Sequence, residues 1–301
     1  MFNKSFLVNK IVNSLLSNKF EVFLTHGCFD IAAKKDYLLL IKSLTNIDGL
    51  NQDQAMSLRA VSYFLSAYPM VVSVKTNRSL LGKEIIYSRF NLPVITPEML
   101  LKILEEELVP AIEAAKGKHT IEIDAEGLRE KRKQMQLTLE QLAEMIGISK
   151  KALYEIEKNR VHPTNETVKK LEAVMKIELK NPYKMKTSEK IYLKPKNEFQ
   201  TNVSNELNRI GIDNSPVYSA PFEIVGKEKF SLITSLTKDG FEIKKEANVV
   251  KRLSLIFSSK AVFIAKKCKE HEVDGVPIVL ESELPEIETS KELDKILEEK
   301  A

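Results

Sequence analysis

The segment LTLEQLAEMIGISKKALYEIEKN, residues 137–159, decides the class of the middle of this chain. Apolar residues recur at helical spacing on both sides of Gly147, and Thr138 and Ser149 stand at positions typical of helix N-caps. Gly147 tolerates the positive φ that a tight turn between two helices requires. The segment therefore predicts two short helices joined by a turn, the spacing that presents one helix to a DNA major groove.

Two further helices are predicted beside this pair. Thr138 is followed three residues later by Gln141, which is the spacing of a capping box. The predicted helices cover residues 125–135, 138–146, 149–158 and 166–175. Their apolar side chains are expected to form one small core made of Leu128, Leu139, Leu142, Met145, Ile146, Ile148, Leu153, Ile156, Val168, Leu171 and Val174.

This pattern resembles the phage-repressor (XRE) type of helix-turn-helix over residues 128–180. The resemblance is carried by the apolar positions, the small Ala143, the glycine turn, the Ser149-Lys150 pair at the start of the third helix and Glu157 near its end. It implies that Arg132 and Glu157 form a buried structural ion pair, so that Glu157 does not contact DNA.

The same resemblance implies which side chains meet DNA. The exposed face of the third helix is expected to read bases through Lys150, Lys151, Tyr154 and Glu155. Lys158 and Arg160 are expected to bind phosphates. The family often has Gln at the start of the second helix, whereas this chain has Leu139. We therefore expect fewer base-specific contacts than in phage repressors. A helical bundle used for protein contact is the alternative.

The positive charge of the chain is concentrated in its middle. The net charge is only +4, which by itself indicates no nucleic-acid partner. Residues 128–180 hold twelve basic and eight acidic residues, and residues 184–196 hold five lysines and one glutamate. Residues 182–199 are predicted to be a basic linker; a solvated connection and a phosphate-contacting arm both remain open.

The two flanks read as α/β segments, residues 1–115 and 200–301, on either side of the all-α middle, residues 120–181. They share four matches in the same order: residues 29–31 with 222–224, 40–44 with 232–236, 62–66 with 254–258, and 92–95 with 276–279. A duplicated domain is the prediction, and two unrelated α/β segments with similar apolar spacing are the alternative.

The N-terminal flank supplies the clearest elements. Strands are predicted over residues 20–24, 38–42, 70–74 and 93–96, and helices over 55–67 and 97–107. Residues 1–19 lack the sustained apolar core of a signal peptide and are predicted to be an amphipathic helix. Its apolar face is expected to hold Phe6, Ile11, Val12, Leu15 and Leu16.

The region around Phe29 and Asp30, followed by the apolar residues 37–44, resembles the restriction-endonuclease-like fold, as in archaeal Holliday-junction resolvases. Such enzymes place an Asp at one strand end and a Glu-x-Lys on the next strand, which together hold Mg²⁺ and orient water. Here Asp30 and Lys42 fit single positions, but the Glu is missing, and the second copy keeps only Glu223. Both copies are therefore expected to be catalytically degenerate; Asp30 and Glu223 are expected to make local backbone hydrogen bonds instead.

No other catalytic arrangement is predicted. His26 beside Cys28 does not form a thiol dyad, and Cys28 and Cys268 have neither zinc spacing nor a disulfide framework. The sequence predicts no cofactor, no metal ion, no membrane span and a reducing cytoplasm.

Over most of its length the chain resembles an archaeal family of HTH-type transcriptional regulatory proteins. The motif at residues 26–33, the central helix-turn-helix and the segment at residues 220–223 carry this resemblance. It implies a transcriptional regulator. We predict a non-enzymatic protein that binds double-stranded DNA as a homodimer, because one helix-turn-helix reads only half a site, and whose effector is unknown. A structure-specific nuclease or junction-binding protein and a protein-interaction scaffold are the alternatives.

Overall fold

The computed structural model describes residues 3–105, 112–115, 118–238 and 240–300. The chain forms two compact units, one made of Met1–Arg78 with Lys186–Ala301 and one made of Ser79–Met185. The boundary after Arg78 falls inside the predicted N-terminal domain of residues 1–115. Among the described residues, no helix is long and apolar enough to cross a membrane.

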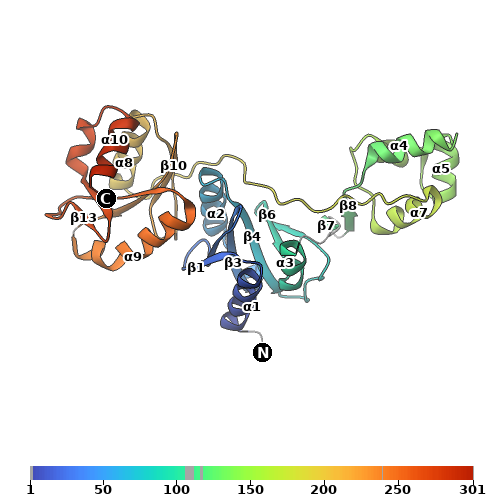
Figure 1. Ribbon diagram of the computed structural model, residues 1–301. Helices are drawn as coiled ribbons and strands as arrows, with labels where there is room; N and C mark the ends of the chain where they lie inside the picture. Colours follow the sequence, from blue (N-terminus) through green and yellow to red (C-terminus); the bar gives the residue numbers. More distant parts are fainter. Residues whose placement is uncertain (1–2, 106–111, 116–117, 239, 301) are drawn as a thin grey trace. The chain divides into compact units, whose positions relative to one another are not determined.

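The first part of the larger unit is a helix-flanked sheet (Figure 1). It contains α1 (Lys4–Ser17), β1 (Glu21–Leu24), β2 (Ile31–Lys34), β3 (Leu38–Asn46), the short η1 (Ile47–Gly49), α2 (Gln52–Phe64) and β4 (Tyr68–Lys75). β1 pairs antiparallel with β2, β2 antiparallel with β3, and β3 parallel with β4. The first six residues of β3 are buried, which is typical of a central strand covered on both faces.

The C-terminal part of the same unit has the same order. It contains α8 (Glu198–Arg209), β9 (Asp213–Pro216), β10 (Ile224–Lys227), β11 (Ser231–Thr237), α9 (Gly240–Phe257), β12 (Lys260–Ala265), β13 (Glu272–Val273), β14 (Val276–Leu280), η2 (Glu281–Glu286) and α10 (Ser290–Glu299). β9, β10, β11 and β12 pair in the directions of β1, β2, β3 and β4. The two segments are therefore copies of one arrangement, as the repeated sequence matches predict.

The strand register corrects one detail of the sequence alignment. Ile31 lies opposite Ile41 in the first copy, and the matching Ile224 lies opposite Thr234 in the second. Lys42 therefore corresponds to Ser235, one residue beyond the Thr234 that the sequence match assigned. The alignment was wrong because both strands are buried on two faces, so no polar alternation marks their register.

The predicted apolar face of α1 was also partly wrong. The buried residues are Leu7, Ile11 and Leu15, which follow one line at intervals of four. Phe6 and Leu16 are 58% and 54% exposed. The helix is amphipathic as predicted, and the half-buried Val8 and Val12 border the line of buried residues.

The two copies pack against each other inside the larger unit with reciprocal contacts. α2 of the first copy packs on β10 of the second, and α9 of the second packs on β2 of the first. The rings of Phe29 and Phe222, which occupy matching positions, both pack against Phe257 in T-shaped geometry. The Cys28 backbone N–H donates to the Ser219 carbonyl at 2.5 Å. This pairing has the form of a two-fold interface, although it lies within one chain.

Part of the predicted linker is docked on the second copy. Leu193 is buried, and its N–H donates to the Ser215 hydroxyl at 2.9 Å. The Tyr192 hydroxyl and the Lys190 ammonium both reach the Asp213 carboxylate, at 2.6 and 2.7 Å. Residues 190–193 are therefore fastened to β9, while the last residues of the predicted linker already belong to α8.

The smaller unit holds the remaining elements. They are β5 (Tyr87–Arg89), β6 (Leu92–Ile95), α3 (Pro97–Leu104), β7 (Ile112–Ala115), β8 (Lys118–Ile121), α4 (Ala125–Gln134), α5 (Leu139–Ile146), α6 (Lys150–Glu157) and α7 (Asn165–Met175). Thr96 caps α3, with Pro97 in its first turn as predicted. The end of the predicted helix, residues 106–107, lies outside the described residues.

Candidate functional site

The four central helices begin and end within a few residues of the sequence prediction (Figure 1). Thr138 and Gln141 form both hydrogen bonds of the capping box at the start of α5. Ser149 caps α6 by accepting the Ala152 N–H. Gly147, between these helices, has φ 73°, the left-handed conformation that glycine adopts most readily.

One apolar cluster holds these helices together. Leu142, Ile146, Leu153, Ile156 and Leu171 are buried in it with other predicted core residues. The cluster also includes residues that the helix pattern did not predict, namely Ile121, Ile123, Met175 and Leu179. Bridges at Thr120 and Ile123 bring the flanking backbone to Thr164 and Lys180.

Met145 was wrongly predicted to belong to the core. Met145 is 57% exposed, whereas Leu142 and Ile146 of the same helix are buried. Leu139 is half-buried and packs against the core cluster. It therefore contributes packing at the position where the resembled family often has a DNA-contacting Gln.

A bidentate ion pair joins α4 to the end of α6. The Arg132 Nε and Nη2 atoms donate to the two Glu157 carboxylate oxygens at 2.6 and 2.9 Å, and Nη1 donates to the Leu137 carbonyl at 2.9 Å. The side chains of Arg132 and Glu157 are only 11% and 4% exposed. The hydrogen bonds to Glu157 raise the pKa of Arg132. The Glu157 carboxylate faces inward and is unavailable to DNA.

The outer face of α6 carries the expected contact residues. Lys150, Lys151, Lys158 and Arg160 are exposed, and Tyr154 is 39% exposed. The Lys158 ammonium and the Arg160 guanidinium lie 5.9 and 6.0 Å from the centre of the Tyr154 ring. These side chains form one continuous basic and aromatic surface, which we call the α6 surface: Lys150, Lys151, Tyr154, Glu155, Lys158 and Arg160.

Two carboxylates restrain the α6 surface. Glu155 lies 3.6 Å from Arg160, and Glu140 of α5 lies 3.3 Å from the Lys150 ammonium. Glu155 thus orients Arg160. Exposed pairs of this kind contribute about 1 kcal/mol or less, so a phosphate can displace either carboxylate at small cost.

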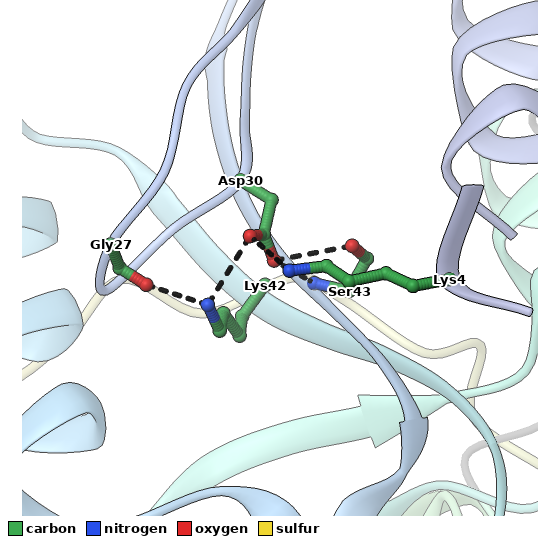
Figure 2. Close-up of polar contacts among 5 residues, drawn as sticks. All are labelled: Lys4, Gly27, Asp30, Lys42 and Ser43. Carbon is green, nitrogen blue, oxygen red and sulfur yellow. Dashed lines mark hydrogen bonds and ion pairs between the residues drawn. The ribbon is translucent and has the colours of Figure 1, made fainter.

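The second candidate position is Asp30, directly before β2 (Figure 2). One carboxylate oxygen accepts the Lys4 ammonium at 2.9 Å and lies 3.3 Å from the Lys42 ammonium. The other oxygen accepts the Ser43 N–H at 2.8 Å and its hydroxyl at 3.1 Å. Lys42 also donates to the Gly27 carbonyl at 2.6 Å. The sequence pattern did not reveal Lys4 and Ser43, because both reach Asp30 only through the tertiary fold.

This donor set does not fit Mg²⁺. Asp30 supplies the carboxylate, but two ammonium groups and Ser43 already surround it, and a cation would have to displace them. In the part of the chain that the structure describes, no group of three His, Cys, Asp or Glu side chains could hold a metal ion. We therefore derive no metal-dependent step at Asp30.

Glu223 occupies the corresponding position in the second copy. Its backbone N–H donates to the Thr234 carbonyl, as the Asp30 N–H donates to the Ile41 carbonyl. Its carboxylate accepts the Leu236 N–H at 2.8 Å, matching the bond from the Ser43 N–H to Asp30. Both carboxylates thus make a backbone hydrogen bond to the adjacent strand.

Cys28 is fully buried, and burial raises its pKa to about 12. The thiol therefore remains protonated at neutral pH, which argues against a nucleophilic role. His26 is exposed, away from this buried environment.

A capped helix-turn-helix in the smaller unit and a sheet of the nuclease-like type in the larger unit define the class of this protein. The chain matches the model of the PD-(D/E)XK superfamily domain at residues 4–109 and that of the Helix-turn-helix family at residues 128–180. It is 31% identical to the "Putative HTH-type transcriptional regulatory protein" of Methanothermobacter thermautotrophicus over 98% of this chain and 96% of the relative.

Proteins of that name from Pyrococcus furiosus and Methanocaldococcus jannaschii are 31% and 29% identical, each over 97% of this chain and 96% of the relative. The chain belongs to this family of HTH-type transcriptional regulatory proteins.

Proposed function

We propose that this protein is a cytoplasmic, sequence-specific transcriptional regulator that binds double-stranded DNA as a homodimer through the α6 surface. The observation that carries the proposal is the basic outer face of a helix whose inner face is held by the core cluster and by the ion pair between Arg132 and Glu157. A helix that is held on its inner face and is basic on its outer face suits binding in the major groove. The names of the relatives agree with this role.

The two ends of α6 are proposed to make different contacts with DNA. Lys150 and Lys151 lie in the first turn of α6, the end of a recognition helix that meets base edges, and lysine pairs with guanine O6 and N7. Lys158 and Arg160 lie at the other end and suit phosphates. Leu139 offers no polar atom, so we assign base specificity mainly to Lys150, Lys151 and Tyr154.

The dimer follows from the number of recognition helices. The two α/β copies pair within one chain, yet each chain has one α6 surface. A palindromic site with half-sites about 34 Å apart needs two such helices, and hence two chains.

Lys150→Ala combined with Lys151→Ala is expected to weaken binding to the protein's own upstream DNA at least tenfold, because two base-edge contacts are lost. Fluorescence-anisotropy titrations at two salt concentrations measure this, with a scrambled duplex as competitor. The wild-type affinity should fall steeply with salt, and saturation should occur at two chains per duplex.

The matched control is Lys169→Ala with Lys170→Ala, which removes the same charge from exposed positions on α7. This variant should stay within about threefold of wild type. Equal losses in both variants, salt-independent binding, or one chain per duplex would each contradict the proposal.

The match to a PD-(D/E)XK domain makes a structure-specific nuclease the second candidate. We infer instead that Asp30 stabilises the fold. Its side chain is 4% exposed, and its carboxylate compensates the positive charge of Lys42, whose side chain is 5% exposed. Asp30→Asn should then cost roughly 2–4 kcal/mol in the free energy of unfolding, measured with urea, since it leaves a buried ammonium. Adding Lys42→Met should recover much of this loss.

The nuclease candidate predicts a different outcome. Wild-type protein incubated with Mn²⁺ or Mg²⁺ and branched DNA would produce cuts, and Asp30→Asn would abolish them while remaining folded. That result would overturn the structural role and establish an enzyme.

A further inference from the structure

A cavity of about 620 Å³ lies in the second copy at the ends of its strands. Lys266 follows the last residue of β12, and Leu280 ends β14, which runs parallel to β12. The carboxyl ends of parallel strands are where α/β folds most often bind ligands. The volume falls in the range of roughly 300–1,000 Å³ that is usual for small-molecule sites.

The described residues that line this cavity are strongly positive. They include four lysines and one carboxylate, namely Lys244, Lys266, Lys267, Lys269 and Glu270. Glu270 is held by the Lys244 ammonium at 2.9 Å, and Lys266 lies 4.9 Å from the centre of the Phe199 ring and 4.0 Å from Glu281. Within the described residues, no carboxylate lies within ion-pair distance of Lys267 or Lys269. Two ammonium groups are therefore available to an anion.

The first copy has fewer lysines at the corresponding strand end. Leu232 pairs with Lys260 as Leu39 pairs with Tyr68, so residues 266–269 correspond to residues 74–77. At the latter position the Asn77 N–H donates to the Asp48 carboxylate, and the Asn46 amide donates to Asn77. Lys267 matches Lys75, whereas Lys266 and Lys269 match Val74 and Asn77, so the second copy carries more lysines at this strand end than the first.

We infer that the cavity binds a small anion bearing two or more phosphate groups, of about the size of a nucleotide. Lysines from α9 and from the segment after β12 line one site, and they match a compact polyphosphate because each lysine acts as a point charge toward phosphate oxygens. A DNA backbone presents the same phosphates, but the volume of this site at the ends of the strands is that of a small-molecule site. The site belongs to the larger unit, whereas the α6 surface belongs to the smaller unit.

Calorimetric titration of the full chain with tripolyphosphate, and then with ATP, tests the inference at fixed ionic strength. Lys267→Glu with Lys269→Glu should weaken binding at least tenfold, because two attractions become repulsions. The matched control is Lys229→Glu with Lys291→Glu, which changes the charge equally at exposed positions outside the lining and should stay within twofold. Both double variants should have nearly the melting temperature of the wild type, because all four lysines are exposed.

Absence of binding at millimolar tripolyphosphate, or equal losses in the two charge-reversal variants, would overturn the inference. Duplex DNA that displaces bound tripolyphosphate, and loses affinity in Lys267→Glu with Lys269→Glu but not in the control, would assign the cavity to DNA and also overturn it. Lys150→Ala with Lys151→Ala should bind tripolyphosphate normally, which separates this test from that of the proposed function.

Discussion

Gly27→Ala is expected to destabilise the larger unit by roughly 3 kcal/mol or more, one of the largest effects of any single methyl group in this chain. Gly27 has φ 134°, a conformation that side-chain-bearing residues rarely adopt. A Cβ atom here would collide with the Ser219 carbonyl oxygen of the other copy. That oxygen also accepts the Cys28 N–H, and the Gly27 carbonyl accepts the Lys42 ammonium. The methyl group would therefore disturb the packing of the copies and the surroundings of Asp30 together.

Urea unfolding measures this loss, and Gly49→Ala is its matched control. A Cβ at Gly49 has no neighbouring atom within 4 Å and its φ is not in the strained region, so this change should stay within about 1 kcal/mol of wild type. Similar unfolding midpoints for the two variants would show that the close contact between Gly27 and Ser219 is not needed for stability, and would contradict this prediction.

Arg132→Ala is expected to cost roughly 3–5 kcal/mol in the stability of the helix-turn-helix, because it leaves the Glu157 carboxylate buried without its cation. The Leu137 carbonyl before α5 also loses a hydrogen bond. DNA affinity should fall with it, since α6 is no longer fixed to α4. Lysine cannot replace this arginine, because its single ammonium cannot make the bidentate pair and the bond to Leu137 together.

Chemical unfolding of Arg132→Ala should be compared with that of Arg129→Ala. Arg129 is on the same helix and makes an exposed pair with Glu126, so its removal should cost about 1 kcal/mol or less. The double change Arg132→Met with Glu157→Leu should recover most of the loss, because two apolar side chains replace a desolvated pair. A small effect of Arg132→Ala, equal to that of Arg129→Ala, would contradict the structural role of the pair.

The helix-turn-helix could be predicted in detail because its signals are local. The caps Thr138 and Ser149, the turn at Gly147 and the helical spacing all act within a few residues of each other. Local preference could not separate Met145 from its neighbours, since both faces of α5 carry apolar residues and only the packing of α6 and α7 decides which is buried.

The copies were less predictable, for two reasons. Their repeat and element order follow from the sequence, but strands buried on both faces lack the polar alternation that would align Lys42 with Ser235. The cavity of the second copy also escaped prediction. The Lys-Lys-Cys-Lys run at residues 266–269 was the available signal, but only the fold places it at a strand end beside Lys244.

The sequence by itself determined the helix-turn-helix, the repeated α/β order and the loss of one nuclease carboxylate, because each depends on residue type and near spacing. Only the tertiary structure decided what Asp30 touches, how the two copies pair and where the lysines converge. These depend on contacts between segments far apart in the chain: Asp30 meets Lys4 and Lys42, and Gly27 meets Ser219. Such contacts carry no local pattern, because their energy appears only when the whole core has formed.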